Sequence, residues 1–552
     1  MSVFSIGQSA LAAAQAGIST TGHNIANANT TGYSRQQVVQ EAATPQQFGT
    51  GYFGQGVQIT TVKRVYNDVL QKQALNAQSA SNASGTYAAK MAKIDSMLSD
   101  PDAGLTPALK DFFASLSKLS SNPGDAPTRQ TVMSASSSLA NRLNSLGNQL
   151  ADMQSEVNSQ IPATVSTINA YSTQIAALND TIEKAYNATG QAPNDLLDQR
   201  DQLVTELSKQ VQTTTVAQGN SYNVFIGNGL PVVVGTNAYS LSAVSSVTDS
   251  SRTEVAYTGA GQASAIQLGT NTLTGGTLGG LLDFRENSLD NIQSQLGQIA
   301  AVLASTVNAQ QAAGQDLNGN TGAALTNFFS TAAPTSTANS LNTGNASVNA
   351  SITNTSALTS SNYSLEFKGG NYIITRLSDN QQMSSTTTLP QVVDGVTFAA
   401  SGTMNSGDSF LIKPTTGGAT SFRFLLTQTN QIAAASASAS AASLKGDGSN
   451  AILLNNLQTN NLIYNGSALI SYSSAFDQVV SATGVKSNEM NLTSTAESNM
   501  LDNITKEQSS TSGVNLDEEA ANLMRYQQAY QAAGKLMQIA NQMFSTLLSI
   551  AG

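Results

Sequence analysis

An apolar residue recurs at every seventh position along the last forty or so residues of the chain. These positions are Leu516, Leu523, Tyr530, Met537 and Phe544, and a second series, three residues later, comprises Tyr526, Ala533, Ala540 and Leu547. Two such series form the a and d positions of a heptad, which is typical of a coiled-coil helix. The pattern therefore predicts one long helix over 516–550. No hairpin partner adjoins this helix in the sequence, so its partner is expected elsewhere in the chain.

The first thirty residues carry a matching heptad built from smaller side chains. Its two series are Phe4, Leu11, Ile18 and Ile25, followed three residues later by Gly7, Ala14, Thr21 and Ala28. Small residues allow two helices to approach closely. Each stripe could also belong to an ordinary amphipathic helix of one globular core. Because the same repeat occurs at both ends, we favour a terminal coiled coil, with the rest of the chain inserted between its two helices.

Between the termini the pattern alternates between helical and strand periodicity. Three-four spacing predicts helices over 65–98, 107–119, 127–160, 162–186, 194–210 and 281–311, and again from about 467. Alternation of apolar and polar residues predicts strands in two regions, including a hairpin of 222–226 and 231–234 and a last strand at 422–425. The stretch 330–355, rich in Ser, Thr, Asn and Ala, is interpreted as a linker or loosely ordered edge.

These elements predict a mainly α protein with inserted β domains and an elongated, nested topology. We assign 1–60 and 510–552 to a paired terminal coiled-coil domain. A helical bundle body is assigned to 61–210, 276–315 and 467–509. One or two small outer β domains are expected, with 211–275 as the first insertion and 340–450 as the second.

Both chain ends resemble a known group of proteins. The N-terminal residues Asn24, Ile25, Ala26, Asn27, Ala28, Asn29, Thr30, Thr31, Gly32, Tyr33, Ser34, Arg35 and Gln36 resemble the signature shared by bacterial flagellar rod, hook and hook-associated proteins. The C-terminal stretch from Ser512 to Leu523, continued by 526–533, resembles the end of the hook-associated protein 1 family, which forms the first junction between hook and filament. The matches cover roughly the first and last forty residues.

The resemblance implies a structural component of the bacterial flagellum that self-assembles through its terminal helices. The implied partners are further copies in a ring, the hook protein, the next hook-filament junction protein and a flagellar export chaperone. It also implies type III export, uncleaved, from the cytoplasm to an extracellular flagellum. The assembly seam is then expected at Phe4, Leu11, Ile18, Ile25, Leu516, Leu523, Tyr530, Met537 and Phe544.

Composition limits the other classes of function. Charged residues make up 11% of the 552 positions, against about a quarter in typical globular proteins, and the net charge is −10. No run of Lys or Arg occurs, so nucleic acid and anionic membranes are poor partners. The absence of Cys excludes disulfides, thiol nucleophiles and thiolate metal sites. We find neither a Sec-type leader nor a stretch apolar enough to span a bilayer.

Few residues suggest chemistry. Asp316, Asn318 and Asn320 alternate as in a calcium loop, but Thr321 and Asn327 occupy the positions where Gly and Glu belong. The Gly-rich segment 54–57 lacks the remaining residues of a phosphate-binding loop and is interpreted as a turn. We therefore expect no metal and no cofactor.

Catalysis is also disfavoured by the few candidate acids and bases. His23, the only histidine, is expected to be structural. Asp195, Asp198 and Asp201 could present an acid and a base to a glycan, but with Arg200 beside them a solvated helix face is the preferred interpretation. The leading hypothesis is a structural junction protein that is not an enzyme. The alternative is a secreted adhesin or peptidoglycan-acting protein that uses the same export route.

Overall fold

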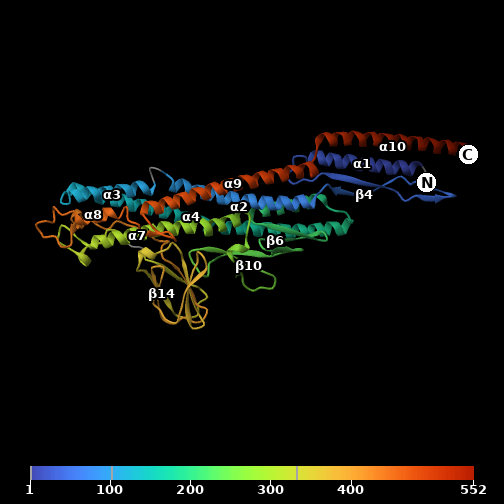
Figure 1. The fold of residues 1–552 in the computed structure, drawn as a ribbon. Helices are drawn as coiled ribbons and strands as arrows, with labels where there is room; N and C mark the ends of the chain where they lie inside the picture. Colours follow the sequence, from blue (N-terminus) through green and yellow to red (C-terminus); the bar gives the residue numbers. More distant parts are fainter. Residues whose placement is uncertain (1–2, 101–103, 331–332, 552) are drawn as a thin grey trace.

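The computed structural model describes residues 3–100, 104–330 and 333–551, which form an elongated molecule (Figure 1). Long helices run along its axis, and both chain termini lie at the same end. Two β domains project from one side of the helical body. The predicted fold class, mainly α with inserted β domains between long terminal helices, is confirmed.

The helical body is built from helices that bury continuous apolar faces. They are α2 (Asp68–Leu98), α3 (Leu105–Ser121), α4 (Ala126–Thr189), α5 (Asn194–Gln210), α6 (Gly276–Phe284), α7 (Asp290–Ala312), α8 (Ser449–Asn456) and α9 (Tyr472–Ser512). Leu139, Leu143, Leu146 and Leu150 form one fully buried face of α4. Their three-four spacing is the pattern that predicted helix in this region.

Two predicted helices, 127–160 and 162–186, are in fact one helix, α4, with Pro162 in its interior. A proline removes one backbone hydrogen bond and usually breaks or kinks a helix. Here the turns on both sides of Pro162 are anchored in the core, because Val157, Ile161 and Ile168 are fully buried. Burial of these side chains holds the two halves in one line, so the predicted break at residue 161 is wrong.

The predicted helix 281–311 is interrupted in a different way. A single π-helical turn, Arg285–Leu289, joins α6 to α7. A π-helical turn contains one more residue than an α-helical turn, so the side chains in and after it point in different directions than in a regular α-helix. Arg285 is thereby directed into the protein, where it is fully buried.

The first β domain, residues 213–267, lies against α4. A four-stranded sheet has the order β5 (Thr213–Gln218), β6 (Ser221–Ile226), β7 (Leu230–Val234), β8 (Asn237–Ala238). A three-stranded sheet has the order β11 (Ile266–Gln267), β10 (Thr253–Thr258), β9 (Ser240–Ser245). The predicted hairpin is the antiparallel pair β6 and β7. Asn169 of α4 exchanges two hydrogen bonds of 2.8 and 2.9 Å with the Leu241 backbone, which fixes this domain to the body.

The second β domain, residues 335–413, consists of two antiparallel sheets. One has the order β13 (Thr335–Ala338), β20 (Ser409–Lys413), β15 (Tyr363–Lys368), β16 (Asn371–Arg376), β17 (Gln381–Thr386). The other has the order β14 (Ser347–Ile352), β19 (Val396–Ser401), β18 (Gln391–Val393). Two further short pairs, β12 (Gly314–Gln315) with β21 (Ala435–Ser436) and β22 (Ile463–Tyr464) with β23 (Leu469–Ile470), lie outside it.

Two expectations for this region are wrong. The stretch 330–355 is not a linker, because β13 and β14 lie within it and Val348 and Ala350 point into the core. Because the stretch is rich in polar residues, the alternation of buried and exposed positions along β14 was not recognised in the sequence.

The predicted strand 422–425 forms only an isolated bridge between Phe329 and Phe424. Phe422 stacks on Phe329 with ring centroids 4.6 Å apart, so this segment belongs to the core of the helical body.

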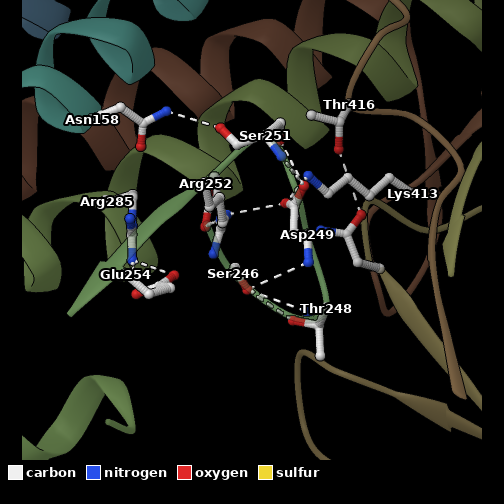
Figure 2. A network of polar contacts seen from close by, with 12 residues as sticks. Asn158, Ser246, Thr248, Asp249, Ser251, Arg252, Glu254, Arg285, Lys413 and Thr416 are labelled. Atoms are coloured by element: carbon white, nitrogen blue, oxygen red, sulfur yellow. Dashed lines mark hydrogen bonds and ion pairs between the residues drawn. The ribbon is translucent and has the colours of Figure 1, made fainter. Parts of the chain in front are cut away.

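A network of ion pairs connects both β domains with the helical body (Figure 2). Lys413, at the end of β20, forms an ion pair with Asp249 of the first β domain. Asp249 also lies 3.3 Å from Nε of Arg252, which in turn pairs with Asp290 at the start of α7. Burial opposes ionisation of Asp249, but Lys413, Ser251 and Arg252 together lower its pKa. The acid therefore stays charged and links the three parts of the molecule.

The terminal region extends beyond the helical body. It contains α1 (Val3–Ala26), the paired strands β1 (Gln36–Ala42) and β4 (Val57–Arg64), the small hairpin β2 (Gln46–Phe48) and β3 (Gly51–Phe53), and α10 (Leu516–Ala551). The Gly-rich segment at 54–57, expected as a turn, leads into β4. Across the described ranges, no helix is both long and apolar enough to cross a bilayer.

Candidate assembly surface

Helices α1 and α10 lie side by side and run in opposite directions (Figure 1). Two glycines of α1 mark the closest approach. A Cβ atom at Gly7 would lie 2.9 Å from Cγ of Met537, and one at Gly17 would lie 2.5 Å from Cδ1 of Tyr526. Both distances are shorter than real Cβ contacts allow. The pair therefore depends on the absence of side chains at these two positions of α1.

Met537 lies over Gly7 within this contact, and the other large residues of the expected seam lie at its flanks. Its centre is formed by the small d positions, since Gly7, Ala14, Thr21 and Ala533 are buried. Of the nine seam residues, none is fully buried in the single chain: Leu11, Ile18, Leu523 and Met537 are half-buried, and Phe4, Ile25, Leu516, Tyr530 and Phe544 are exposed. Close approach of the two backbones displaces the larger side chains outward, which leaves apolar surface uncovered.

The C-terminal turns of α10 expose a row of large apolar side chains. Gly7 lies opposite Met537 and the two helices are antiparallel. The first residue of α1, Val3, therefore lies near residue 541 of α10. Six large apolar residues there are between 53 and 76% exposed: Ile539, Met543, Phe544, Leu547, Leu548 and Ile550. Gln538, Gln542, Ser545 and Ser549 occupy the other side of the helix. This end of α10 is thus amphipathic, and none of the residues that the structure describes covers its apolar side.

A substitution at Gly17 tests the close contact between α1 and α10. In Gly17→Ala, the new methyl group would collide with the Tyr526 ring, and overpacking of this kind costs about 1–3 kcal/mol. We expect amide hydrogen exchange in α1 and α10 of the isolated protein to become at least about fivefold faster. Gly22→Ala is the control, because nothing lies within 4 Å of its Cβ position. Equal exchange rates in the two variants would contradict the close contact.

The N-terminal signature forms the turn that follows α1. Asn24 is 1% exposed, and its amide both accepts from the backbone N–H of Gln36 and donates to the Gln36 carbonyl, each at 2.9 Å. The hydroxyl of Tyr33 donates to the Asn24 side-chain oxygen at 2.7 Å. One buried amide therefore joins the end of α1 to the start of β1. A buried polar group with all these partners specifies one geometry.

The other signature residues complete the reversal of the chain. The Asn27 side chain donates to the His23 carbonyl at 3.0 Å and accepts from the Thr30 hydroxyl at 3.2 Å. Gly32 has a φ of 81°, which favours glycine, and it lies against Gln202 of α5. Ile25, Ala26 and Asn29 are exposed. The signature is therefore mainly a turn motif that sets the direction of α1 relative to the helical body.

The three aspartates of α5 meet the terminal region, and the expected solvated face is wrong for two of them. Asp198 and Asp201 are buried and pair with Nη1 of Arg64, the last residue of β4, at 2.6 and 2.8 Å. Asp198 also accepts from the Ser34 backbone N–H at 3.0 Å. Burial raises the pKa of Asp201. Burial would lower the pKa of Arg64, but Asp201 and Asp198 raise it above its ordinary value.

The third aspartate and the only histidine lie at the edge of the same contact. His23 Nε2 lies 3.2 Å from Oδ1 of the exposed Asp195, and its ring packs edge-on against Tyr33 at 5.6 Å. Gln36 also donates to Asp195, at 2.8 Å. These contacts join α1 to α5. They give His23 a positioning role, in agreement with its interpretation as a structural residue.

Two arginines connect the terminal region to the rest of the chain: Arg35, which belongs to the signature but had no predicted role of its own, and Arg64, which was missed from the sequence. The backbone N–H of Arg35 donates to the Ser512 carbonyl at 2.8 Å, and its side chain pairs with Glu518 of α10 at 2.7 Å. Arg35 immediately precedes β1 and Arg64 ends β4. In a chain with only 11% charged residues, one arginine within the signature and another at the end of the following strand pair were a usable signal.

The calcium-like loop closes on itself. The two side-chain oxygens of Asp316 accept four hydrogen bonds from the backbone and side-chain amides of Asn318 and Asn320, at 2.8–3.2 Å. The amides of the two asparagines thus turn their donors toward Asp316. Within 3–100, 104–330 and 333–551, no three His, Cys, Asp or Glu residues are placed to hold a metal ion.

Four family descriptions match successive parts of the chain. Residues 4–33 match "Flagella basal body rod protein", and residues 91–329 match "Flagellar hook-associated protein FlgK helical domain". Residues 337–414 match "Flagellar hook-associated protein 1, D2-like domain", and residues 508–550 match "Flagellar basal body rod FlgEFG protein C-terminal".

Curated relatives match over nearly the whole length. Flagellar hook-associated protein 1 of Escherichia coli (strain K12) is 36% identical over 546 residues, which cover 98% of both chains. The protein of the same name from Salmonella typhimurium is 36% identical over 550 residues, again 98% of both chains. Among solved structures, the flagellar hook junction protein FlgK from Burkholderia pseudomallei superimposes with a TM-score of 0.73 at 28% identity. That match covers 80% of this chain and all of the other.

Proposed function

The chain belongs to the flagellar hook-associated protein 1 family, a structural family of the hook-filament junction, and on that premise we propose that α1 and α10 form its assembly surface. Its function is structural, at the junction between hook and filament. Met537 lies within the contact between α1 and α10, the other eight seam residues flank it, and five of the nine remain exposed. In the assembled flagellum, neighbouring subunits would cover these side chains.

The uncovered apolar end of α10 is the observation that carries this proposal. Six large apolar side chains between Ile539 and Ile550 are more than half exposed in the single chain. Burial of one such side chain contributes about 1.5–3 kcal/mol, so assembly has a strong driving force here. Contiguous apolar patches on soluble proteins generally mark interaction sites.

The surrounding surface supports the same proposal. With 11% charged residues, identical copies can approach closely without large electrostatic repulsion or desolvation of many ionised groups. We propose that copies form a ring, with the hook protein on one side and the next hook-filament junction protein on the other. A flagellar export chaperone would cover the apolar end of α10 before type III export of the uncleaved chain to the cell exterior.

An enzymatic role has little support. The relatives are structural flagellar proteins, and of the three acids that could have acted on a glycan, Asp198 and Asp201 pair with Arg64 and Asp195 lies beside His23. Adhesion or action on peptidoglycan is therefore not supported as an alternative. We propose that the protein works as a fixed component and not as a catalyst.

A strain lacking the protein provides the test of this function. Such cells should build hooks without filaments and release unpolymerised filament protein into the medium. Restoring the protein should restore filaments, with a small constant number of copies per hook in purified hook-basal bodies. Quantitative mass spectrometry and electron microscopy measure both quantities. Normal filaments in the deletion strain would contradict the proposal. So would filament growth in the restored strain with no copies of the protein retained in purified hooks.

A further inference from the structure

The terminal region and the helical body share no hydrophobic core within the described residues. The continuous core of buried apolar side chains extends from Leu75 to Val479 and takes no member from 3–64 or 516–551. The chain crosses between the two parts at two short links, 65–67 and 513–515. The direction of the terminal region therefore depends on the polar contacts beside these links.

Arg64 is the anchor on the terminal side of the first link. Its Nη1 donates to Asp198 at 2.6 Å and to Asp201 at 2.8 Å, and its side chain is 9% exposed. The guanidinium carbon also lies 4.6 Å from the centre of the Tyr66 ring, which belongs to the link itself. Two buried carboxylates and one aromatic ring thus hold the end of β4 against α5.

The first β domain reaches the same link through Tyr222, near the start of β6. The side chains of Tyr222 and Tyr66 share a hydrogen bond. Arg200 of α5 stacks on the Tyr222 ring, with its guanidinium carbon 3.6 Å from the ring centre, and is itself 2% exposed. A line of contacts therefore runs from the first β domain through Tyr222 and Tyr66 to Arg64.

The backbone of Tyr222 is firmly held by the helical body. The buried amide of Asn179, on α4, donates to the Tyr222 carbonyl at 2.8 Å and accepts from the Tyr222 N–H at 3.1 Å. Arg200 donates to the Asn179 side-chain oxygen at 3.0 Å and to the Asn220 carbonyl at 2.7 Å. Figure 1 shows β6 nearer to the terminal region than β14 of the second β domain. Tyr222 is therefore a fixed support for Tyr66.

We infer that Tyr222 is a positioning residue for assembly. Through Tyr66 and Arg64 it holds the terminal region in one direction relative to the helical body. This inference rests on the proposed function, because that direction matters for assembly when α1 and α10 meet neighbouring subunits. The 36 residues of α10 span about 54 Å. A rotation of about 10° at the link would move the far end of α10 by about 9 Å, far more than closely packed surfaces tolerate.

The absence of Cys from the chain allows two spin labels to be placed at chosen positions. Gln8 of α1 and Thr173 of α4 are both exposed, so labels on Gln8→Cys and Thr173→Cys leave the fold undisturbed. Double electron–electron resonance then measures the distribution of distances between the terminal region and the helical body in the free protein. Unlabelled variants are compared for their retention in purified hooks by immunoblot.

Tyr222→Phe removes the hydroxyl that reaches Tyr66 but leaves the ring on which Arg200 stacks. Tyr257→Phe is the matched control, because the Tyr257 hydroxyl donates to the Pro231 carbonyl at 2.7 Å within the same β domain. Arg64→Met removes the anchor itself.

We expect one narrow distance distribution in the parent and in Tyr257→Phe. In Tyr222→Phe the population outside that distribution should rise about two- to tenfold, as expected for the loss of one hydrogen bond. Retention in hooks should fall at least twofold for Tyr222→Phe and at least tenfold for Arg64→Met. Amide hydrogen exchange in β6 should stay at the parental rate in Tyr222→Phe, because Asn179 still holds this strand.

A parental distance distribution in Tyr222→Phe would overturn the positioning role. Faster exchange throughout β6 would also overturn it, because the β domain itself would then be destabilised. A wider distribution with parental retention in hooks would overturn the link to assembly and leave the proposed function intact. Absence of the parent protein from purified hooks would overturn the proposed function itself.

Discussion

Replacement of Glu254 by Leu is expected to lower the free energy of unfolding by about 3–5 kcal/mol, because it leaves a buried arginine without its counter-ion. Nη2 of Arg285 donates to both carboxylate oxygens of Glu254, at 2.7 and 2.8 Å (Figure 2). Nη1 donates to the Thr253 carbonyl at 2.7 Å. The Arg285 side chain is fully buried and that of Glu254 is 8% exposed, so water cannot replace the lost partner.

Urea denaturation monitored by circular dichroism measures this loss. Asp180→Asn is the control, because Asp180 pairs with Lys184 on the surface of α4 and such pairs contribute about 0–1 kcal/mol. The double variant Glu254→Leu, Arg285→Met should recover most of the lost stability, since both charges are then removed. A single variant no less stable than Asp180→Asn would contradict the importance of the buried pair.

Phe544→Asp should abolish incorporation into the hook while the free protein remains folded. Phe544 is 64% exposed in the single chain, so the substitution disturbs little until a neighbouring subunit covers it. An unpaired buried carboxylate then costs about 3 kcal/mol or more, which weakens each subunit contact by over a hundredfold. We expect non-motile cells that secrete filament protein. Swimming in soft agar and immunoblots of purified hooks measure the two effects.

The neighbouring substitution Ser545→Asp serves as the control, because it adds the same charge on the polar side of α10. These cells should swim normally. Both proteins should melt at the same temperature as the parent when purified as monomers. If the two strains swim equally well, the apolar side of α10 is not an assembly surface.

The heptads at the two ends were sufficient to predict α1 and α10 and their occurrence as a pair. Such periodicity is a local property, since residues seven apart share a helix face whatever the rest of the chain does. The signature was also identifiable from sequence, because its turn is closed by residues that lie near one another, such as Asn24 and Tyr33. Composition likewise indicated a surface with few charges.

The sequence did not determine how these elements meet. Small residues of α1 occupy the centre of the contact with α10, and of the large seam residues Met537 lies there with them, because the separation of the two helices is set only when their backbones pack. Pro162 lies inside one continuous helix because distant side chains anchor both halves.

By itself, the sequence determined the terminal helices, the alternation of helical and β regions, and the family signature, because each depends on residues close together in the chain. Only the tertiary structure decided whether ionised groups such as Asp198 and Asp201 are buried and which partners they have. Arg64, more than 130 positions earlier in the chain, reaches both carboxylates and converts an expected solvated face into a buried joint. Whether an ionised group faces water or a counter-ion depends on contacts between distant segments, and those contacts exist only in the folded chain.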